Sequence, residues 1–350
     1  MKLMQFLKVL SWILGGERLS NEVGALGNWP NVNVEDAYDA MFDAYDEVPS
    51  KIGDICEIKT PSEGSYDKRT SVIGAGKLTQ KATEDTSVTY RRPSEGYTAY
   101  CVYRNFDDGF SLTKNEVEDI PPSKINDIAQ GYARGWGNAL VRTEEVFLAS
   151  LFKNGGKTAG SDDFNASIPG GESFITNGLS YDAEPAFNLS DNTRSSKGGG
   201  TYYNAIQQPL NVTNYGTLYE LMFATNAYDE RDEEIETASQ GTIALIYPPQ
   251  LHDSAVQALE SEFLPGSDLN DKNPWARTAK LLQWGYLRAN ATTWYIQVLK
   301  MGIRFYRRGK PELRYFRDED TGRYMGTCRS RYGWMFWNFR YSGGSNVPTS

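Results

Sequence analysis

The 350-residue sequence has a single histidine, His252, and only three cysteines, Cys56, Cys101 and Cys328. No Cys-x-x-Cys pair occurs, so neither a zinc site nor a disulfide framework is indicated, and a reducing cytosol is the simplest compartment. A histidine-rich metal site is excluded, and a Ser–His–Asp or Cys–His triad would have to use His252. His252 lies in PPQLHDSAVQAL, near an expected helix start, where we interpret it as a solvent-facing or capping residue.

Long apolar runs and an overall basic charge are also missing. No segment reaches the ~20 apolar residues that a membrane span needs. The start, MKLMQFLKVLSWILGG, resembles a secretory signal, but Lys8 interrupts the apolar run and no A-x-A cleavage site follows. We therefore expect an amphipathic helix that docks on another protein surface, with membrane anchoring as the alternative.

The net charge of −9 argues against a general nucleic-acid-binding protein. Residues 301–350 differ from the rest, since they hold ten Arg or Lys and four Asp or Glu, a local charge of +6. A basic end on an acidic chain suggests contacts between copies, with phosphate binding as the alternative explanation.

One long helix dominates the sequence, from Ser123 to Gly155. Apolar residues recur there at steps of three and four, which predicts an amphipathic helix: Ile125, Ile128, Tyr132, Trp136, Leu140, Phe147 and Leu151. Ser123 is the expected N-cap, and Gly155 and Gly156 are expected to end the helix. Three interior glycines, Gly131, Gly135 and Gly137, each cost about 1 kcal/mol relative to alanine. They predict a bend or a close backbone contact.

The segments before this helix predict a short helix and then a β-hairpin. VEDAYDAMFDAYDEVP places one apolar face opposite its acids: Val34, Tyr38, Met41, Phe42 and Tyr45. TSVTYRR and GYTAYCVYRNF are rich in strand formers, and the charged KLTQKATED lies between β-rich runs. A two-stranded ribbon with a polar tip is only marginally stable alone, so we expect it to lie on another surface, which a neighbouring copy would supply.

The segments after the helix predict a loop region and then a compact α/β unit over residues 212–300. TIALIY is a buried strand stopped by Pro248 and Pro249, QLHDSAVQALESEF is a helix, and LLQWGYL and TTWYIQVL are β-rich. Asp318 to Gly322 predicts a hairpin turn. The run from Arg329 to Tyr341 mixes arginines with aromatics. Such a mixture suits single-stranded nucleic acid or a protein interface, and the acidic chain favours the interface.

An acid-rich stretch within residues 157–204 raises the possibility of a calcium or glycosidase-like site. Its acids are Asp162, Asp163, Asp182, Glu184 and Asp191. Their spacing matches no EF-hand loop, and acid content alone does not identify a catalytic carboxylate pair. We favour a solvated loop, and we assign no catalytic, cofactor-binding or metal-binding residue.

The order of these parts resembles the major capsid proteins of tailed bacteriophages, the Hong Kong 97-type fold, and in particular the Mu-like major head subunits. The resemblance covers roughly residues 35–345. The matching pieces are NFDDGFSLTKNEVED, the long helix after it, TIALIYPPQLHDSAVQAL, LPGSDLNDKNPW and TTWYIQVLKMGIRFYRRGKPELRYFRDEDTGRYMGTCRSRYGWMFWNFRYSG.

This resemblance implies an α+β chain with a fixed order of domains. They are an N-terminal arm at 1–63, an extended β-hairpin E-loop at 64–107, a P-domain at 108–212 with a spine helix at 124–153, an A-domain at 213–305, and a return to the P-domain at 306–350. Many members carry a scaffolding segment that a protease removes. No long charged coiled coil is present here, so scaffolding, if used, is expected to be a separate protein.

The function that the resemblance implies is structural and not enzymatic. Hexamers and pentamers of the chain would form an icosahedral shell around double-stranded DNA, in a virion assembled in the host cytoplasm. Scaffolding, portal and decoration proteins would be further partners, DNA contact would be weak and non-specific, and no membrane is implied. An encapsulin-type compartment is the alternative, and a carbohydrate-active enzyme using the 162–191 carboxylates is a remote one.

Some members of this family cross-link an E-loop lysine to an asparagine of a neighbouring subunit. Lys77 and Lys81 occupy suitable positions in the sequence, and Asn338 or Asn346 would be the acceptor. No motif supports such a cross-link.

Overall fold

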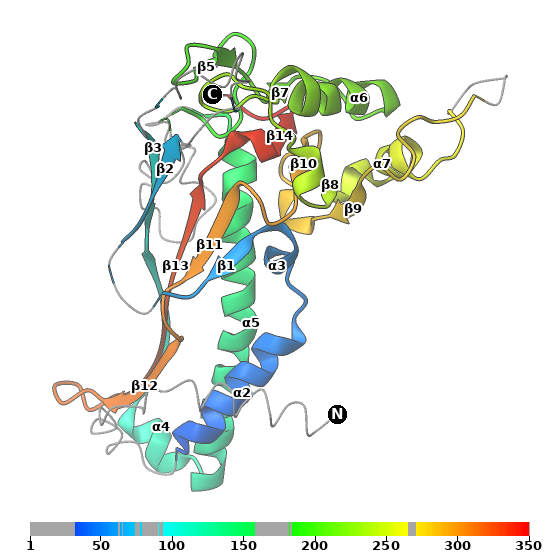
Figure 1. The fold of residues 1–350 in the computed structure, drawn as a ribbon. Coiled ribbons are helices and arrows are strands. Elements are labelled where there is room, and N and C mark those ends of the chain that lie inside the picture. The colour runs from blue at the N-terminus through cyan, green and yellow to red at the C-terminus, as the bar shows by residue number, and fades with distance from the viewer. Residues whose placement is uncertain are drawn as a thin grey trace. The chain divides into compact units, whose positions relative to one another are not determined.

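The computed structural model contains two compact units (Figure 1). It describes residues 32–61, 64, 66–73, 78, 90, 94–157, 182, 184–264 and 271–349. Within that part of the chain, the first unit comprises residues 32–48, 106–140 and 310–330, and the second comprises residues from 49–105, 141–309 and 331–349. None of the described helices is long and apolar enough to cross a membrane. The expected helix at residues 1–16 lies outside the described residues.

The predicted long helix is confirmed as α5, Pro122–Asn154. It begins one residue earlier than expected because proline suits the first helical position, where its missing N–H is not needed. Ser123 therefore lies inside the helix, and its assignment as N-cap was wrong. Gly155 follows the end of the helix as expected, but it packs closely and does not adopt a left-handed conformation. A Cβ atom on Gly155 would lie 2.6 Å from the Phe187 ring.

The burial of α5 changes along its length. Its first part is amphipathic, with one buried stripe made of Ile125, Ala129, Ala133, Trp136 and Leu140. Tyr132, which the apolar pattern placed in that stripe, is 48% exposed. From Glu144 to Asn154 almost every side chain is buried. The second part is therefore a core helix of the second unit, where polar groups need internal partners.

In the first unit, α2 (Val34–Glu47) packs on α5 through its smallest residues (Figure 1). The Asn33 side chain caps its start by accepting from the backbone N–H of Glu35. The predicted apolar face opposite the acids is confirmed, since Met41 is buried, Val34, Tyr38, Phe42 and Tyr45 are half-buried, and the acids of the helix are exposed. Three alanines complete the buried face: Ala37, Ala40 and Ala44. A Cβ atom on Gly137 of α5 would overlap the Met41 carbonyl oxygen and lie 3.0 Å from the Ala44 Cβ atom.

The three interior glycines of α5 therefore have different environments. The close backbone contact that they predict is confirmed at Gly137. Around Gly131 and Gly135, an added Cβ atom would meet nothing within 4 Å. Only Gly137 is required by the packing between α2 and α5.

The sheet of the first unit is built from β12 (Glu312–Arg317), the first half of β13 (Tyr324–Phe336) and β4 (Arg104–Leu112). The predicted turn at Asp318–Gly322 joins β12 to β13, with Gly322 at φ 67°. Aromatic side chains hold α5 against this sheet: Phe110 stacks on Tyr132 with ring centroids 4.0 Å apart. The short helix α4 (Lys114–Asp119) carries a capping box.

In the second unit, the second half of β13 pairs with β11 (Ile303–Arg307), and β11 pairs in parallel with β1 (Glu57–Lys59). Between the ladders of β11 and β12, four residues, 308–311, oppose only residues 330 and 331 of β13. Gly309 takes a left-handed φ of 73° in this bulge. Phe147 of α5 packs on the sheet, 6.2 Å from the ring of Phe305.

The second sheet of this unit has the strand order β7-β14-β10-β8-β9. Its strands are β7 (Ala205–Ile206), β14 (Ser342–Ser345), β10 (Trp294–Val298), β8 (Ile243–Tyr247) and β9 (Lys280–Gln283). The predicted strand–Pro-Pro–helix motif is confirmed, since β8 leads into the one-turn η5 (Pro249–Leu251) and then α7 (His252–Leu259). β9 then pairs with β8 in parallel, so β8, α7 and β9 form a crossover unit.

Smaller elements complete the second unit. They are α3 (Ile52–Ile55), β2 (Tyr66–Ile73), β3 (Ser94–Val102), β5 (Arg194–Ser195), β6 (Thr201–Tyr202), α6 (Val212–Glu220), η3 (Leu221–Thr225), η4 (Ala238–Gln240), η6 (Gly285–Leu287) and η7 (Phe339–Tyr341). The run LLQWGYL was expected to be β-rich throughout, but β9 ends at Gln283. The residues after Trp284 form the one-turn helix η6 instead. The core residues of α6, α7 and the second sheet form one hydrophobic cluster.

Two consecutive acids of α5 are buried in the second unit. Glu144 is 1% exposed and forms a two-point ion pair with Arg307, with Nε–Oε1 and Nη2–Oε2 distances of 2.9 and 2.6 Å. Glu145 is 2% exposed. Its carboxylate accepts from the Trp284 indole at 2.6 Å, the Ser50 hydroxyl at 2.7 Å and the Lys51 backbone N–H at 2.6 Å. The two side chains thus tie α5 to different elements.

Substituting the glycines of α5 singly should separate their roles. We expect Gly137→Ala to lower the free energy of unfolding by about 2 kcal/mol because of overpacking against α2. Gly131→Ala and Gly135→Ala should each raise it by up to about 1 kcal/mol, since alanine is the better helix former. Denaturant unfolding of the purified chain measures all three. A Gly137→Ala variant as stable as Gly135→Ala would contradict the close contact.

Removing the Glu145 carboxylate should be strongly destabilising. Glu145→Ala leaves the buried Trp284 indole N–H without an acceptor, at about 1–3 kcal/mol, and also removes the hydrogen bonds to Ser50 and Lys51. We expect a total loss of about 3 kcal/mol. Arg142→Ala, on an exposed position of the same helix, is the matched control and should change stability by less than about 0.5 kcal/mol. Thermal and denaturant unfolding measure the loss of stability in both variants. Equal losses in the two variants would refute the role of Glu145.

Candidate functional site: the β2–β3 hairpin and its supports

A long hairpin is present as predicted, and its described part consists of β2 and β3. The run TSVTYRR, expected to be β-rich, lies mostly outside the described residues. The strands pair from Tyr66 with Val102 to Ile73 with Ser94, with one shift of register between Thr70 and Val72. Most of residues 74–93, which include the charged tip, lie outside the described residues.

The base of the hairpin rests on its own chain. Ala99 and Cys101 of β3, together with Tyr103, form a buried cluster with Tyr306 and Met335 of the β11–β13 sheet. The Tyr103 and Tyr306 rings meet edge to face, with centroids 6.1 Å apart. The expectation that the ribbon needs a surface is correct, but for the base that surface belongs to the same chain.

The middle of the hairpin is held by an arginine stacked on an indole ring. The Arg69 guanidinium of β2 lies 3.5 Å from the centroid of Trp337, and Arg304 lies 5.9 Å from the same centroid. Glu57 neutralises Arg304 through a 2.6 Å ion pair. Burial, reinforced by the nearby charge of Arg304, lowers the pKa of Arg69 from its usual value. A cation–π contact of this kind contributes about 0.5–2 kcal/mol.

The far end of the described hairpin touches two loops of the second unit. The Tyr97 hydroxyl of β3 donates to the Ser195 carbonyl at 3.0 Å, and the Lys197 ammonium lies 4.3 Å from the Tyr97 ring centroid. The Arg231 guanidinium donates to the Ile73 carbonyl at 3.3 Å. Both strands are therefore held at the point where their described part ends.

The aromatic and basic run from Arg329 to Tyr341 is largely the interior of its own chain. Trp334, Met335, Phe336, Phe339 and Tyr341 are all buried. Their assignment to an interface was wrong because α5 packs on β13 and the base of the hairpin packs on Met335 of the same strand. The run alone does not reveal that its own chain covers these side chains.

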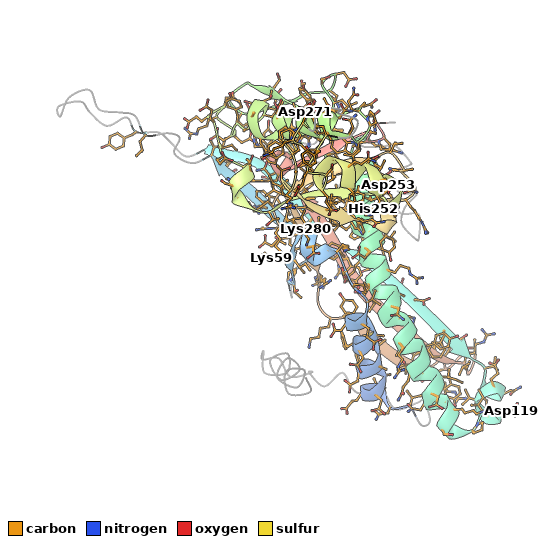
Figure 2. All side chains as sticks on the ribbon, turned by 90° about the vertical axis from the view of Figure 1, so that its right-hand side faces the viewer. Lys59, Asp119, His252, Asp253, Asp271 and Lys280 are labelled. Carbon is orange, nitrogen blue, oxygen red and sulfur yellow. The ribbon has the colours of Figure 1, made fainter. Side chains whose placement is uncertain are left out.

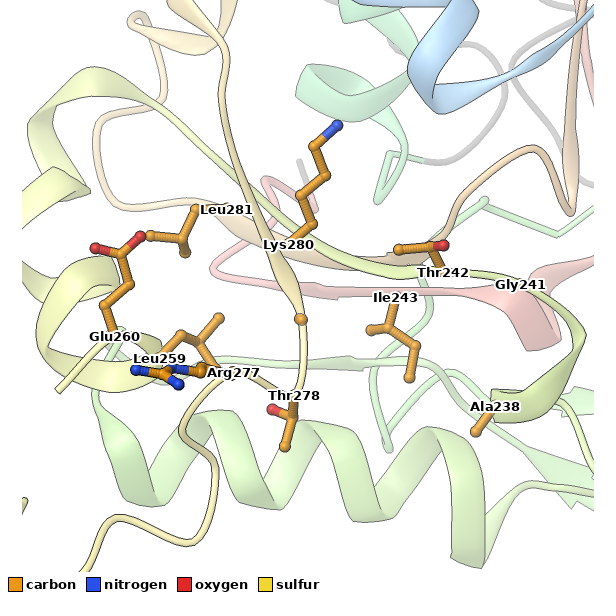
Figure 3. A pocket seen from close by; sticks show the side chains of 11 residues that line it. Ala238, Gly241, Thr242, Ile243, Leu259, Glu260, Arg277, Thr278, Lys280 and Leu281 are labelled. Atoms are coloured by element: carbon orange, nitrogen blue, oxygen red, sulfur yellow. The ribbon is translucent and has the colours of Figure 1, made fainter. Parts of the chain in front are cut away.

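A wide groove of about 690 Å³ lies beside the second sheet (Figure 3). The beginnings of β8 and β9, the end of α7 and residues near η4 line it. Glu260 and Arg277 lie at one end of it (Figure 3). Arg277 adopts a left-handed φ of 62°, and its N–H donates to the Leu259 carbonyl at 2.7 Å. The lining residues include hydroxyls and charges of both signs but neither histidine nor cysteine, so they do not offer the usual nucleophile–base pair.

His252 lies at the start of α7, as expected, and is exposed (Figure 2). The Tyr247 hydroxyl and the His252 Nδ1 atom are 3.1 Å apart. The neighbouring acid, Asp253, is also exposed.

The acid-rich stretch separates into different environments. Asp182 forms an ion pair with Arg194 at 3.3 Å, with side chains 5% and 1% exposed, so it is not a solvated loop residue. Glu184 is partly buried and Asp191 is exposed. Asp162 and Asp163 lie outside the described residues. Among the residues that the structure describes, no group of three or more His, Cys, Asp or Glu side chains is placed to hold a metal ion.

The asparagines considered for a cross-link both make hydrogen bonds within the chain. Asn338 caps η7 by accepting from the backbone N–H of Arg340 at 3.1 Å. The Asn346 amide donates to the carbonyls of Gln208 and Thr292 at 3.0 and 3.1 Å. Lys77 and Lys81 lie outside the described residues.

Sequence patterns did not identify the residues that support the hairpin. The contacts of Arg69 with Trp337 and of Arg231 with Ile73 join residues more than 150 positions apart, and no local pattern encodes them. The glycine-rich segment SSKGGGT, residues 195–201, could have indicated one of the supporting loops. Consecutive glycines often mark a close approach of the backbone to another group.

Comparison with known proteins gives a likeness of fold. No family model and no curated protein matches the sequence. The mature capsid of bacteriophage PhiM1 matches with a TM-score of 0.51 and 9% identity, over 86% of this chain and 89% of that chain. The capsid of an empty GTA particle (TM-score 0.48, 12% identity, 86% and 92% covered) and the virus-like particle from Pyrococcus furiosus (0.45, 11%, 89% and 98%) are less similar in structure.

At such low identity the likeness establishes the fold and nothing more, and of these three matches the PhiM1 match has the highest TM-score. It spans most of both chains, and the mixed α+β content agrees with it. The chain therefore has the Hong Kong 97-type fold of tailed-bacteriophage major capsid proteins.

Proposed function

We propose that this chain is the major capsid protein of a tailed bacteriophage. Hexamers and pentamers of it form an icosahedral shell that encloses the double-stranded DNA genome. The observation that carries the proposal is the likeness to the PhiM1 mature capsid, which covers 86% of this chain and 89% of that chain. A likeness confined to one part of the chain would not favour a shell protein over other α+β proteins.

The proposed domains follow that fold. The N-terminal arm is 1–63, the E-loop 64–107, the P-domain 108–212 with its spine helix, the A-domain 213–305, and the return to the P-domain 306–350. The β2–β3 hairpin supports the E-loop, α5 supports the spine helix, and the α6, α7 and β8–β10 elements support the A-domain.

The proposed role is structural, with no catalytic step. In support, the conspicuous polar groups of the described chain serve the fold: Glu144 and Asp182 are each paired with a buried or half-buried arginine. The remote alternative of a carbohydrate-active enzyme would need two carboxylates facing a cleft. Asp182, one of its candidates, is bound to Arg194 instead.

Other copies of the chain are the principal proposed partners, within a virion capsid assembled in the host cytoplasm. Scaffolding, portal and decoration proteins are the further proposed partners. The net charge of −9 favours weak, non-specific contact with packaged DNA over tight binding, and no membrane contact is proposed.

Expression of the chain, alone and with its scaffolding protein, tests the proposal. We expect closed shells of uniform size in negative-stain electron microscopy and a matching large species in light scattering. A monomer at all concentrations under both conditions would refute it. Particles from infected cells distinguish the encapsulin-type alternative: nuclease-protected DNA of genome length supports the capsid, and an enclosed enzyme without DNA supports the compartment.

Shortening the hairpin tests the contribution of its tip to the shell. Ile73 pairs with Ser94, so residues 74–93 can be replaced by an Asn-Gly turn, which suits a two-residue hairpin loop. The strands that rest on the chain are retained, and a folded chain that no longer forms shells is expected. The control is a same-length tip of altered sequence order. Normal shells from the shortened chain would contradict a role for the tip.

A further inference from the structure

The two loops that touch the far end of the hairpin form one structural unit. We call residues 195–200 and 229–233 the hairpin clamp. The first loop binds Tyr97 through the Ser195 carbonyl, and the second binds Ile73 through Arg231. Each strand of the hairpin is thus held by a different loop, and the relative position of the loops affects both contacts.

A single carboxylate holds the two loops together. Asp232, in the second loop, accepts from the Ser196 hydroxyl at 2.5 Å and the Gly200 backbone N–H at 3.0 Å, both in the first loop. It also accepts from the Tyr202 hydroxyl at 2.7 Å. Burial alone would raise the pKa of Asp232, but these three hydrogen bonds and the charge of Arg340 outweigh burial and hold the pKa below its usual value.

The backbone of both loops is shaped around this carboxylate. A Cβ atom on Gly200 would lie 2.5 Å from Oδ1 of Asp232, and a Cβ atom on Gly198 would overlap Oδ2. Asp232 itself has a φ of 60°, a left-handed conformation that aspartate tolerates better than most residues. The glycines of SSKGGGT therefore provide space for Asp232.

Buried arginines anchor the clamp to the C-terminal segment. Arg340 donates to the Tyr228 carbonyl and, at 2.8 Å, to Glu230 of the second loop. Arg340 and Arg194 lie 4.6 and 4.2 Å from the ring centroid of Phe339. The clamp is therefore fastened to packed parts of the second unit, whereas β2 and β3 form a sheet of only two strands.

A two-stranded ribbon does not hold its own direction in water, so the direction of its far end depends on what it touches. We propose that the hairpin clamp fixes the direction in which the β2–β3 hairpin leaves the second unit, and that Asp232 is the positioning residue that keeps the clamp closed. This deepens the proposed function and rests on it in one respect: in a shell, the direction of the hairpin decides where its tip meets a neighbouring copy.

Distance measurement between spin labels on the unassembled full-length chain tests the proposal. Labels at Glu95→Cys on β3 and Gln257→Cys on α7 occupy exposed positions of the second unit. The native cysteines are all buried, and burial raises the pKa of the Cys328 thiol to about 12, so labelling is selective. We expect a narrow distance distribution in the parent and at least a twofold broader one in Asp232→Ala.

Matched variants separate positioning from general loss of stability. Asp191→Ala removes an exposed carboxylate from a nearby part of the sequence and should leave the distribution unchanged. Asp232→Asn keeps one acceptor oxygen for Ser196 and Tyr202 but presents no acceptor to Gly200, so it should give an intermediate width. Asp232→Ala no broader than Asp191→Ala would overturn the proposal.

A second variant keeps the proposal testable if Asp232→Ala does not fold. Tyr97→Phe removes only the hydroxyl that binds Ser195 and should also broaden the distribution, and an unchanged width would overturn the clamp. Because the distance measurement needs no shell, the capsid function and the clamp can be refuted separately. If Asp232→Ala broadens the distribution but the parent chain never assembles, the capsid function alone is refuted. If the parent chain forms shells but Asp232→Ala leaves the distribution unchanged, the clamp alone is refuted.

Discussion

The second unit depends on the burial of two adjacent acids in a helix that is covered on nearly all sides. A buried carboxylate is stable only if its hydrogen-bonding capacity is met inside the protein, and Glu144 and Glu145 meet it with different elements. Glu144 binds Arg307 of β11, and Glu145 binds Trp284 beside β9 and the start of α3 at Lys51. Neighbouring helical positions point about 100° apart, so the pair links α5 to both sheets and fixes its rotation between them.

The sequence predicted those parts of the fold that depend on local pattern. The long helix, the strand–Pro-Pro–helix motif, the Asp318–Gly322 turn and the hairpin all follow from periodicity and turn residues. The sequence did not predict the burial of residues that are covered by a segment distant in the chain. Gly137 is required and Gly135 is not, although the two glycines look alike in the sequence, because only Gly137 faces α2. The aromatic run from Arg329 looked like an interface because its cover, α5 and the hairpin base, is distant in sequence. The β14 strand, Ser-Gly-Gly-Ser, has no strand signal at all.

The described part of the hairpin is held by its own chain along its whole length. Its base is core, its middle is stacked on Trp337, and its far end is held by Tyr97 and Arg231.

The bulge at residues 308–311 has a consequence for how this chain tolerates insertions and deletions. In a continuous ladder, a one-residue change of length reverses the face of every side chain beyond it. Here β11 and β12 pair with β13 in separate registers, and the intervening four residues oppose two. A length change within 308–311 can therefore be absorbed without reversing the inward and outward faces of either ladder. An insertion or deletion in this short segment leaves the buried faces of both strands in place.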